Sequence, residues 1–300
     1  MQKKQQRHWV KKWNCTFRSK KETLIPWILL APSLTGVSVF ILIPFADVVR
    51  RSFLNAVGSE FVGVKNYKSV LDNTAFQLAA GNTVRFLAVC LPLLLGVSLL
   101  FGQLLLRAGK KSGILKSGFL LPMAVPAGSV VLFWQLFFDK GGMLNELLQH
   151  AGIKGPDYMN TTKAFGVLVA VYLWKNLGYD MILWLSGLMG ISDSLYEAAK
   201  MDGADELKCF WYITCPLLLP TAFLTGILSL VNAFKVFREA YMIAGSYPHD
   251  SIYMLQNLFN NWFLKLDMQK MTAAAVMLAL VLGGILIGSQ KIEEKWGQGM

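Results

Sequence analysis

The sequence predicts an all-α, polytopic membrane protein with six transmembrane helices and with both termini in the cytoplasm. Only 16% of its 300 residues are charged, whereas a soluble domain carries about 25%, and 54% are hydrophobic. The hydrophobic residues form long runs, and the mean hydropathy is +0.45. Each run must be helical, because an open strand would leave backbone groups without hydrogen bonds in lipid. The bilayer is therefore the predicted solvent for most of the chain.

The first predicted element is a basic cytoplasmic tail over residues 1–24. Its first 21 residues hold eight Lys and Arg residues, and an apolar run follows directly. Positive charge beside a membrane span is typical of the cytoplasmic side, where anionic lipid attracts it. The net charge of +11 is therefore attributed to the membrane surface, and no nucleic-acid partner is predicted. A disordered basic tail is the alternative interpretation of this segment.

Six segments are long and apolar enough to cross the hydrocarbon core, which takes about 20 helical residues each. With their connecting loops they form one predicted six-helix transmembrane domain over residues 25–290, and a cytoplasmic tail follows over 291–300. The fourth and fifth segments are the most polar. The six predicted spans are residues 25–49, 78–106, 115–138, 164–189, 210–235 and 269–289.

The distribution of positive charge sets the predicted orientation. With the N-terminus inside, 16 of the 29 Lys and Arg residues fall in the four segments that face the cytoplasm. The basic tail and the 107–116 loop carry most of this excess. The loops over residues 50–77 and 139–163 are then predicted to face outward, and the 190–209 loop to face the cytoplasm.

Three motifs typical of enzymes are absent from the sequence. There is no Gly-x-x-x-x-Gly-Lys-Ser/Thr loop to hold nucleotide phosphates, so the chain is not predicted to hydrolyse ATP. Neither His-Glu-x-x-His nor Gly-x-Ser-x-Gly is present. The four cysteines form no Cys-x-x-Cys pair, so neither a metal nor any other cofactor of its own is predicted.

Small residues gather in the predicted cytoplasmic loop over residues 190–220. Ala198, Ala199 and Ala204 leave room for another surface to approach the backbone closely. Gly203 permits a sharp turn, so the sequence predicts two short helices joined at this point. A generic acidic loop between two spans is the alternative interpretation.

The same loop carries residues that typically cap or start helices. We expect Asp193 or Ser194 to cap the first short helix, which places the Glu197 carboxylate in its first turns, where negative charge is favoured. Pro216 and Pro220 are expected to fix the point where the chain re-enters the membrane.

This loop resembles the EAA motif, the cytoplasmic coupling loop of permease subunits in ATP-binding cassette (ABC) importers. The family pattern is Glu-Ala-Ala, three residues, Gly, about nine residues, Ile, two variable positions and Pro. Cys215 stands where Leu is usual. The residues of this chain assigned to the motif are Glu197, Ala198, Ala199, Asp202, Gly203, Ala204, Ile213, Pro216 and Pro220.

Three further segments resemble the carbohydrate-uptake branch of these importers. They are residues 61–67 in the first outer loop, Asn82-Thr83 near the start of the second span and residues 142–145 in the second outer loop. Residues 244–248 depart from the Thr-x-Gly-Gly-Pro of many relatives, and this departure bears on the class of substrate.

The resemblance implies a multi-pass permease of the bacterial cytoplasmic membrane that carries a sugar or oligosaccharide. In such an importer a dimer of ABC ATPase subunits binds ATP and Mg²⁺, and an extracellular solute-binding protein delivers the substrate. A second, related permease, usually a different chain, completes the path. Glu197 is expected to pair with a basic residue of the ATPase, while the alanines pack against it. Closure of the ATPase dimer would then move the loop and alternate access across the membrane.

Polar side chains in the fourth and fifth predicted spans are candidates for the transport path. Polar groups are costly in lipid and usually face a bundle interior or a cavity. Carboxylate, amide and aromatic groups suit a sugar, whose hydroxyls form hydrogen bonds and whose ring stacks on aromatic faces. Alternatively, they bond to other helices or to the partner permease. The candidates are Tyr172, Asn176, Tyr179, Asp180, Ser229 and Asn232.

Two other functions stay open at this point. A permease for another polar solute, such as a glycerol phosphate, a polyamine or a peptide, would show the same features. A stand-alone ion-coupled secondary transporter would explain the six spans equally well, but not the chemistry of the 190–220 loop. A requirement for ATP and a separate ATPase, rather than an ion gradient, distinguishes the two classes.

Overall fold

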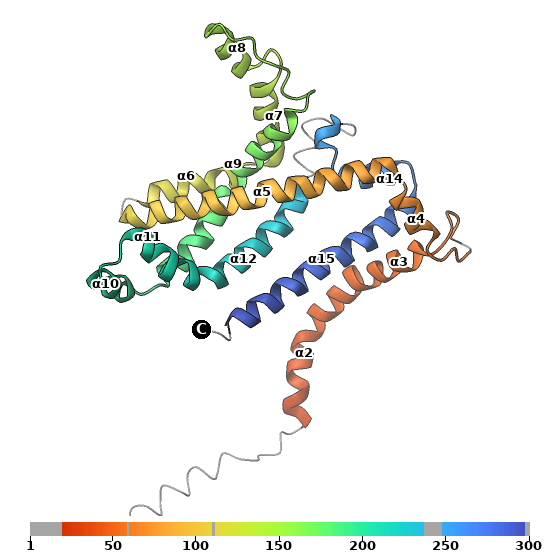
Figure 1. Cartoon of the computed structure of the whole chain (residues 1–300). Coiled ribbons are helices and arrows are strands. Elements are labelled where there is room, and N and C mark those ends of the chain that lie inside the picture. The colour runs from red at the N-terminus through yellow and green to blue at the C-terminus, as the bar shows by residue number, and fades with distance from the viewer. Residues whose placement is uncertain (1–19, 59, 110–111, 237–247, 298–300) are drawn as a thin grey trace, which may run out of the picture.

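A computed structural model of the protein describes residues 20–58, 60–109, 112–236 and 248–297 (Figure 1). These residues fold into helices joined by loops, and apart from one isolated bridge between Leu54 and Phe61 they contain no β-structure. The predicted all-α class is confirmed. Most of the predicted basic tail and residues 244–247 lie outside the described residues.

The described residues contain α-helices of very different length. In chain order they are α2 (Lys20–Val37), α3 (Ile43–Ser52), α4 (Lys65–Leu71), α5 (Thr74–Arg107), α6 (Ser112–Ala124), α7 (Ala127–Phe138), α8 (Met143–His150), α9 (Ala164–Met189), α10 (Asp193–Met201), α11 (Glu206–Cys209), α12 (Cys215–Ala233), α14 (Leu255–Leu264) and α15 (Met268–Gly297).

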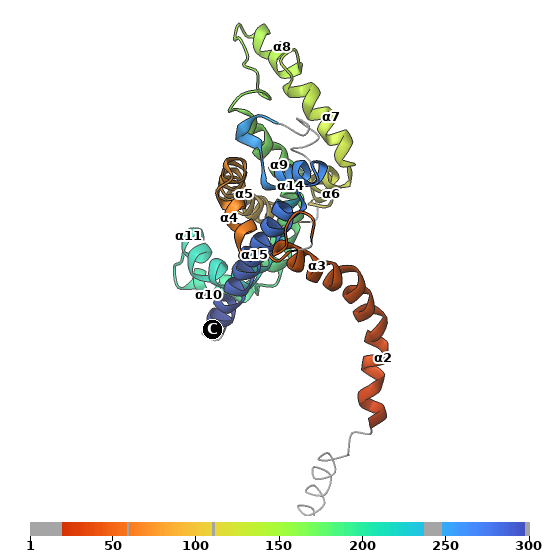
Figure 2. The same cartoon turned by 90° about the vertical axis from the view of Figure 1, so that its right-hand side faces the viewer.

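The first predicted span is one helical run in which the π-helix η2 (Ser38–Leu42) joins α2 to α3. Its C-terminal part, α3, packs along α15. Its N-terminal part, α2, leans away from the other helices in both views (Figures 1 and 2). The side chains of α2 from Pro26 onward are largely exposed, so within this chain α2 contributes little to the core.

The centre of the molecule is α9, which contacts α5, α6 and α12. Small residues let these helices approach closely. A Cβ atom added at Gly178 would collide with the backbone carbonyl of Phe119 in α6. Phe86 of α5 and Tyr172 of α9 pack edge to face, with their ring centroids 5.4 Å apart. Dense packing on several sides lets α9 carry polar residues that lipid would not accept.

The third predicted span is not one continuous helix, which corrects the prediction of a single helix over residues 115–138. The chain breaks at Val125 and Pro126, and the helical segments on either side are inclined by 96°. Proline removes a helical N–H donor and disfavours helical geometry at the preceding residue, which accounts for the break. The arms beyond the break, α7 and α8, project away from the bundle (Figures 1 and 2).

Within the described part of the chain, four helical segments are long and apolar enough to cross a membrane, or up to five if the bent pair counts as one span. The helix α9 is not among them, because Lys175, Asn176 and Asp180 lower its hydropathy. Six spans with both termini in the cytoplasm therefore stay a prediction. The four segments are Pro26–Ser52, Thr74–Arg107, Glu206–Ala233 and Met268–Lys295.

Candidate functional site

The loop that carries the EAA-like residues contains the two short helices that the sequence predicts. They are α10 and α11, which follow α9 and precede α12. Both lie at one end of the helix bundle, the end at which α15 also finishes, while α4 and α14 lie at the other end (Figure 1). The loop thus connects α9, the central helix, to α12, which packs against it.

The turn between the two helices closes around Gly203, whose φ is +79°. The N–H of Gly203 donates to the carbonyl of Lys200 at 3.0 Å, and the N–H of Ala204 donates to the carbonyl of Ala199 at 2.9 Å. This pair of bonds is the Schellman arrangement, in which glycine accommodates the left-handed residue. Asp205 then caps α11 by accepting from the N–H of Lys208 at 2.8 Å. The sharp turn expected at Gly203 is present.

The start of α10 differs from the prediction. Ser192, rather than Asp193 or Ser194, is the N-cap, because its backbone is extended and Asp193 is already helical. Its side chain makes no capping bond to the helix and instead lies 2.8 Å from the hydroxyl of Ser194. The helix therefore begins one residue earlier than expected, and the Asp193 carboxylate lies in its first turn.

The prolines after the loop do not interrupt the helix that contains them. Residues Glu206–Ala233 form one helical run, in which the π-helix η4 (Phe210–Thr214) joins α11 to α12. Pro216 lies in the first turn of α12, where a missing N–H costs little, and Pro220 lies within that helix. Ile213 is half-buried in the π-helix.

The surface of the loop combines exposed acidic and apolar side chains. Glu197, Ala198 and Asp202 are exposed, and Ala199 and Ala204 are half-buried. Exposed large apolar side chains in the same loop as exposed acidic ones suit a protein-binding site. The large apolar side chains on this surface are Leu195, Met201 and Leu207, which are 45%, 89% and 69% exposed.

The residues predicted for the transport path separate into two groups. Tyr172, Asp180 and Ser229 are at most 3% exposed, and Ser229 donates a 2.6 Å hydrogen bond to Asp180 across the contact between α9 and α12. Such a bond is expected under the alternative interpretation, in which these polar side chains bond to neighbouring helices instead of to a solute. The others, Asn176, Tyr179 and Asn232, are half-buried, and the Asn176 amide donates to the carbonyl of Tyr172 at 2.9 Å.

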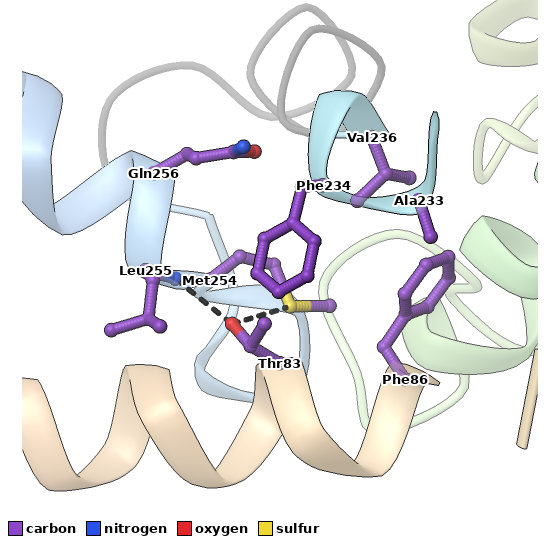
Figure 3. A pocket seen from close by; sticks show the side chains of 8 residues that line it. All are labelled: Thr83, Phe86, Ala233, Phe234, Val236, Met254, Leu255 and Gln256. Carbon is purple, nitrogen blue, oxygen red and sulfur yellow. Dashed lines mark hydrogen bonds between the residues drawn. The ribbon is translucent and has the colours of Figure 1, made fainter. Parts of the chain in front are cut away.

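A small pocket lies between α5, the end of α12 with the short helix η5 (Phe234–Val236), and the start of α14 (Figure 3). The hydroxyl of Thr83 accepts from the N–H of Leu255 at 3.1 Å and lies 3.9 Å from the sulfur of Met254. Because the lining is mostly apolar, the pocket suits packing better than sugar binding. Sequence reasoning missed it, since its walls lie some 170 residues apart in the chain. The lining residues are Thr83, Phe86, Ala233, Phe234, Val236, Met254, Leu255 and Gln256.

The three segments that resemble the carbohydrate-uptake branch, two in outer loops and one in α5, share one structural feature. Each contributes an asparagine whose amide donates to two or three backbone carbonyls, so that one side chain fixes a whole loop. This common role was not evident in the sequence. Asn66 donates to Ser52 and Leu54, Asn82 to Asp250 and Tyr253, and Asn145 to Asp139, Lys140 and Pro156.

Comparison with known families identifies the chain. Residues 85–294 match the family described as binding-protein-dependent transport system inner membrane component, and this match covers more than two thirds of the sequence. The chain belongs to this family. The family predicted from the EAA-like loop is thereby confirmed, and the protein is a multi-pass transport permease of the membrane rather than an enzyme.

Two relatives of this permease match over most of their length. The chain is 32% identical to the trehalose/maltose transport system permease protein MalF of Thermococcus litoralis, over 83% of this chain and 87% of the relative. It is 27% identical to the sn-glycerol-3-phosphate transport system permease protein UgpA of Agrobacterium fabrum, over 86% and 91%.

The permease fold is also that of a solved transporter. A chain from the crystal structure of a bacterial ABC transporter involved in the import of the acidic polysaccharide alginate matches with a TM-score of 0.81. The match covers 93% of this permease and 98% of the other chain. The sequences are 17% identical, so the likeness establishes a shared fold and nothing finer.

Proposed function

We propose that this permease forms part of the membrane path of a bacterial ABC importer for a sugar or oligosaccharide. The family description supports delivery by an extracellular solute-binding protein. The name of the MalF relative supports a carbohydrate, whereas the name of UgpA supports the alternative of a glycerol phosphate. A polyamine or a peptide is the less favoured polar solute, because neither relative is named for one.

Coupling to ATP hydrolysis is assigned to the α10–α11 pair. The observation that carries this assignment is a hydrogen-bonded helical pair that exposes Glu197, Met201 and Leu207 at one end of the bundle. A loop that only connected two spans would have no reason to expose apolar side chains on an ordered surface. An ABC ATPase subunit, with its own ATP and Mg²⁺, would cover this surface. Glu197 would pair with a basic residue there.

The transport path is assigned to the half-buried polar residues Asn176, Tyr179 and Asn232. They are accessible enough to meet a solute or a second permease, whereas Asp180 and Ser229 are enclosed within this chain. A second, related permease, in a heterodimer, would supply the facing wall of the path. The solute then passes between two subunits rather than through one.

The test is affinity purification of the full chain from its native membrane in a mild detergent, with mass spectrometry of the proteins that accompany it. We expect an ABC ATPase, a second related permease and a solute-binding protein, and the ligand held by the binding protein names the substrate. A chain that is repeatedly isolated alone, and is active with an ion gradient instead of ATP, would establish a secondary transporter.

A charge reversal in the loop tests the coupling assignment directly. We expect Glu197→Lys to leave the permease in the membrane but to remove the ATPase subunit from the purified complex, because the lysine would face a basic partner. Glu294→Lys is the matched control, since Glu294 is an exposed acidic residue on α15 outside the loop. Equal recovery of the ATPase with Glu197→Lys and with wild type contradicts the assignment.

A further inference from the structure

The α10–α11 pair is held to the membrane helices by a hydrogen bond that the docking proposal does not use. The hydroxyl oxygens of Tyr196 in α10 and Thr214 in η4 are 2.8 Å apart. Tyr196 directly precedes Glu197, and successive residues of a helix point about 100° apart. Tyr196 is half-buried and its hydroxyl contacts η4, the π-helix that precedes α12, whereas Glu197 is exposed. Within one turn of α10, Glu197 is therefore available to a partner protein, while Tyr196 contacts another part of its own chain.

Thr214 has a second polar neighbour, because its hydroxyl lies 3.4 Å from the backbone carbonyl of Cys209. A threonine hydroxyl has a single proton, so it donates fully to one of these neighbours at a time, and either hydroxyl can be the donor in the shorter bond between Thr214 and Tyr196. These two contacts connect α10 to the π-helix η4, which precedes α12. Thr214 is only 5% exposed, so water does not compete well for this contact.

The segment that contains Thr214, the π-helix η4, has an unusual backbone. In η4 the N–H of Cys215 donates to the carbonyl of Phe210, five residues earlier, rather than to the residue four earlier. Such π-helical turns are rare and are concentrated at functional sites. The Thr214 hydroxyl reaches Cys209 across the same interval. Tyr196 therefore contacts α12 where its backbone departs from regular geometry.

Farther into the membrane, α12 is also packed tightly against α9. A Cβ atom added at Gly187 would lie 2.9 Å from the Cβ of Thr221, and beyond this contact Ser229 bonds to Asp180. A second contact of the loop, the ion pair between Arg107 of α5 and Glu206 of α11, is 2.9 Å long but largely exposed on both sides and is therefore weak. The part-buried bond between Tyr196 and Thr214 is better shielded from water than this ion pair.

We propose that Tyr196 is a positioning residue for coupling, whose hydroxyl makes α10 and α12 move together. Displacement of α10 by the ATPase subunit then reaches the membrane through Thr214 as well as through the chain itself. Without this bond, α10 can tilt about the non-helical residues at its two ends and leave α12 in place. This proposal rests on the docking of an ATPase to the α10–α11 pair.

The test measures the movement of α12 and needs no transport substrate. Spin labels are attached at Val231→Cys on α12 and Leu280→Cys on α15, which are 44% and 71% exposed, in a chain whose native cysteines are replaced. The distance between the labels is measured in the purified transporter complex with and without Mg-ATP. We expect the nucleotide to change this distance in the otherwise unaltered chain, and Tyr196→Phe to reduce the change by at least half while ATP hydrolysis persists.

The controls separate positioning from folding and from docking. Tyr212→Phe removes a hydroxyl from a tyrosine that is 80% exposed in the same π-helix, and it should leave the change intact. Thr214→Val should act like Tyr196→Phe, whereas Thr214→Ser keeps a hydroxyl and should restore the change. An undiminished change in Tyr196→Phe overturns the proposal, as does the absence of any change without this substitution.

A further outcome also counts against positioning. If Tyr196→Phe and Thr214→Val both lose the ATPase subunit from the complex, the bond serves folding or docking and the proposal is wrong. The Glu197→Lys variant is purified in parallel to keep the two proposals apart. Retention of the ATPase by Glu197→Lys would count against docking itself, whatever Tyr196→Phe does.

Discussion

At the scale of single residues, Asp180 shows how a polar group is accommodated inside this permease. The side chain is 1% exposed and accepts a hydrogen bond from Ser229, a residue of the neighbouring helix. Removal of one partner from a buried hydrogen bond leaves the other unsatisfied, which costs about 1–3 kcal/mol. Asp180 therefore joins α9 to α12 in this structure, and a direct contact with solute would require the helices to separate.

This role predicts how stability responds to substitution. We expect Asp180→Ala to lower the free energy of unfolding by about 1–3 kcal/mol, because the Ser229 hydroxyl loses its acceptor. Asp180→Asn keeps an acceptor oxygen and should stay close to wild type. The measurement is the midpoint of thermal unfolding in detergent. Asn176→Ala is the control, since its amide bonds within its own helix. A chain with Asp180→Ala that is as stable as wild type would contradict the packing role.

The three asparagines that donate to backbone carbonyls of loops show a second role of single polar residues. Asn66, Asn82 and Asn145 each donate to two or three backbone carbonyls. Asn82 connects α5 to a segment about 170 residues away in the chain. Their positions in family-like segments indicated importance, but only the folded chain reveals which carbonyls each amide meets.

At the scale of elements, the turn between α10 and α11 depends on the conformation of one glycine. Gly203 has a left-handed backbone, yet a Cβ atom added there would meet nothing within 4 Å in this chain. A side chain at this position therefore costs backbone strain but no internal collision. Asparagine tolerates the left-handed region better than other residues with a side chain. Gly203→Asn therefore adds a side chain at this position with little backbone strain.

The turn gives a prediction that distinguishes local folding from partner contact. We expect Gly203→Asn to keep α10 and α11 folded, as measured by amide hydrogen exchange, but to weaken retention of the ATPase subunit. The physical reason is that the added side chain occupies space that a closely packed partner would need. Gly109→Asn is the control, because Gly109 also has a positive φ and open space but lies outside the loop. Full retention of the ATPase by Gly203→Asn would place Gly203 outside the interface.

At the scale of the whole molecule, the arrangement of helices brings α10 and α11 to the end of the bundle where α15 finishes (Figure 1). The loop containing α8 lies on a separate arm beyond the bend at Pro126 (Figures 1 and 2). The predicted orientation places the first of these regions in the cytoplasm and the second outside the cell. The side of the membrane on which each region lies is a property of the entire chain.

Cysteine labelling of intact cells measures this orientation. We expect a membrane-impermeant maleimide to label Leu147→Cys in α8 directly but to label Met201→Cys in α10 only after the membrane is opened. Both positions are exposed, at 62% and 89%, so access across the membrane rather than burial decides the result. Labelling of Met201→Cys from outside would refute the predicted topology and, with it, docking of a cytoplasmic ATPase.

The sequence by itself determined the fold class, the family and the two short helices around Gly203. These features depend on composition and on local spacing, because long apolar runs select helices in lipid and a glycine selects the left-handed turn. The sequence also identified Asn66, Asn82 and Asn145 as part of family-like segments. Local patterns did not reveal their hydrogen-bond partners.

Only the tertiary structure decided which polar residues face one another and where an apolar run bends. The pairing of Asp180 with Ser229 and of Tyr196 with Thr214 depends on how distant helices pack, which periodicity within one helix does not encode. The bend at Pro126 likewise interrupts a run that composition alone assigns to one span. Proline can be accommodated within a helix or can end it, and the surrounding contacts determine which occurs.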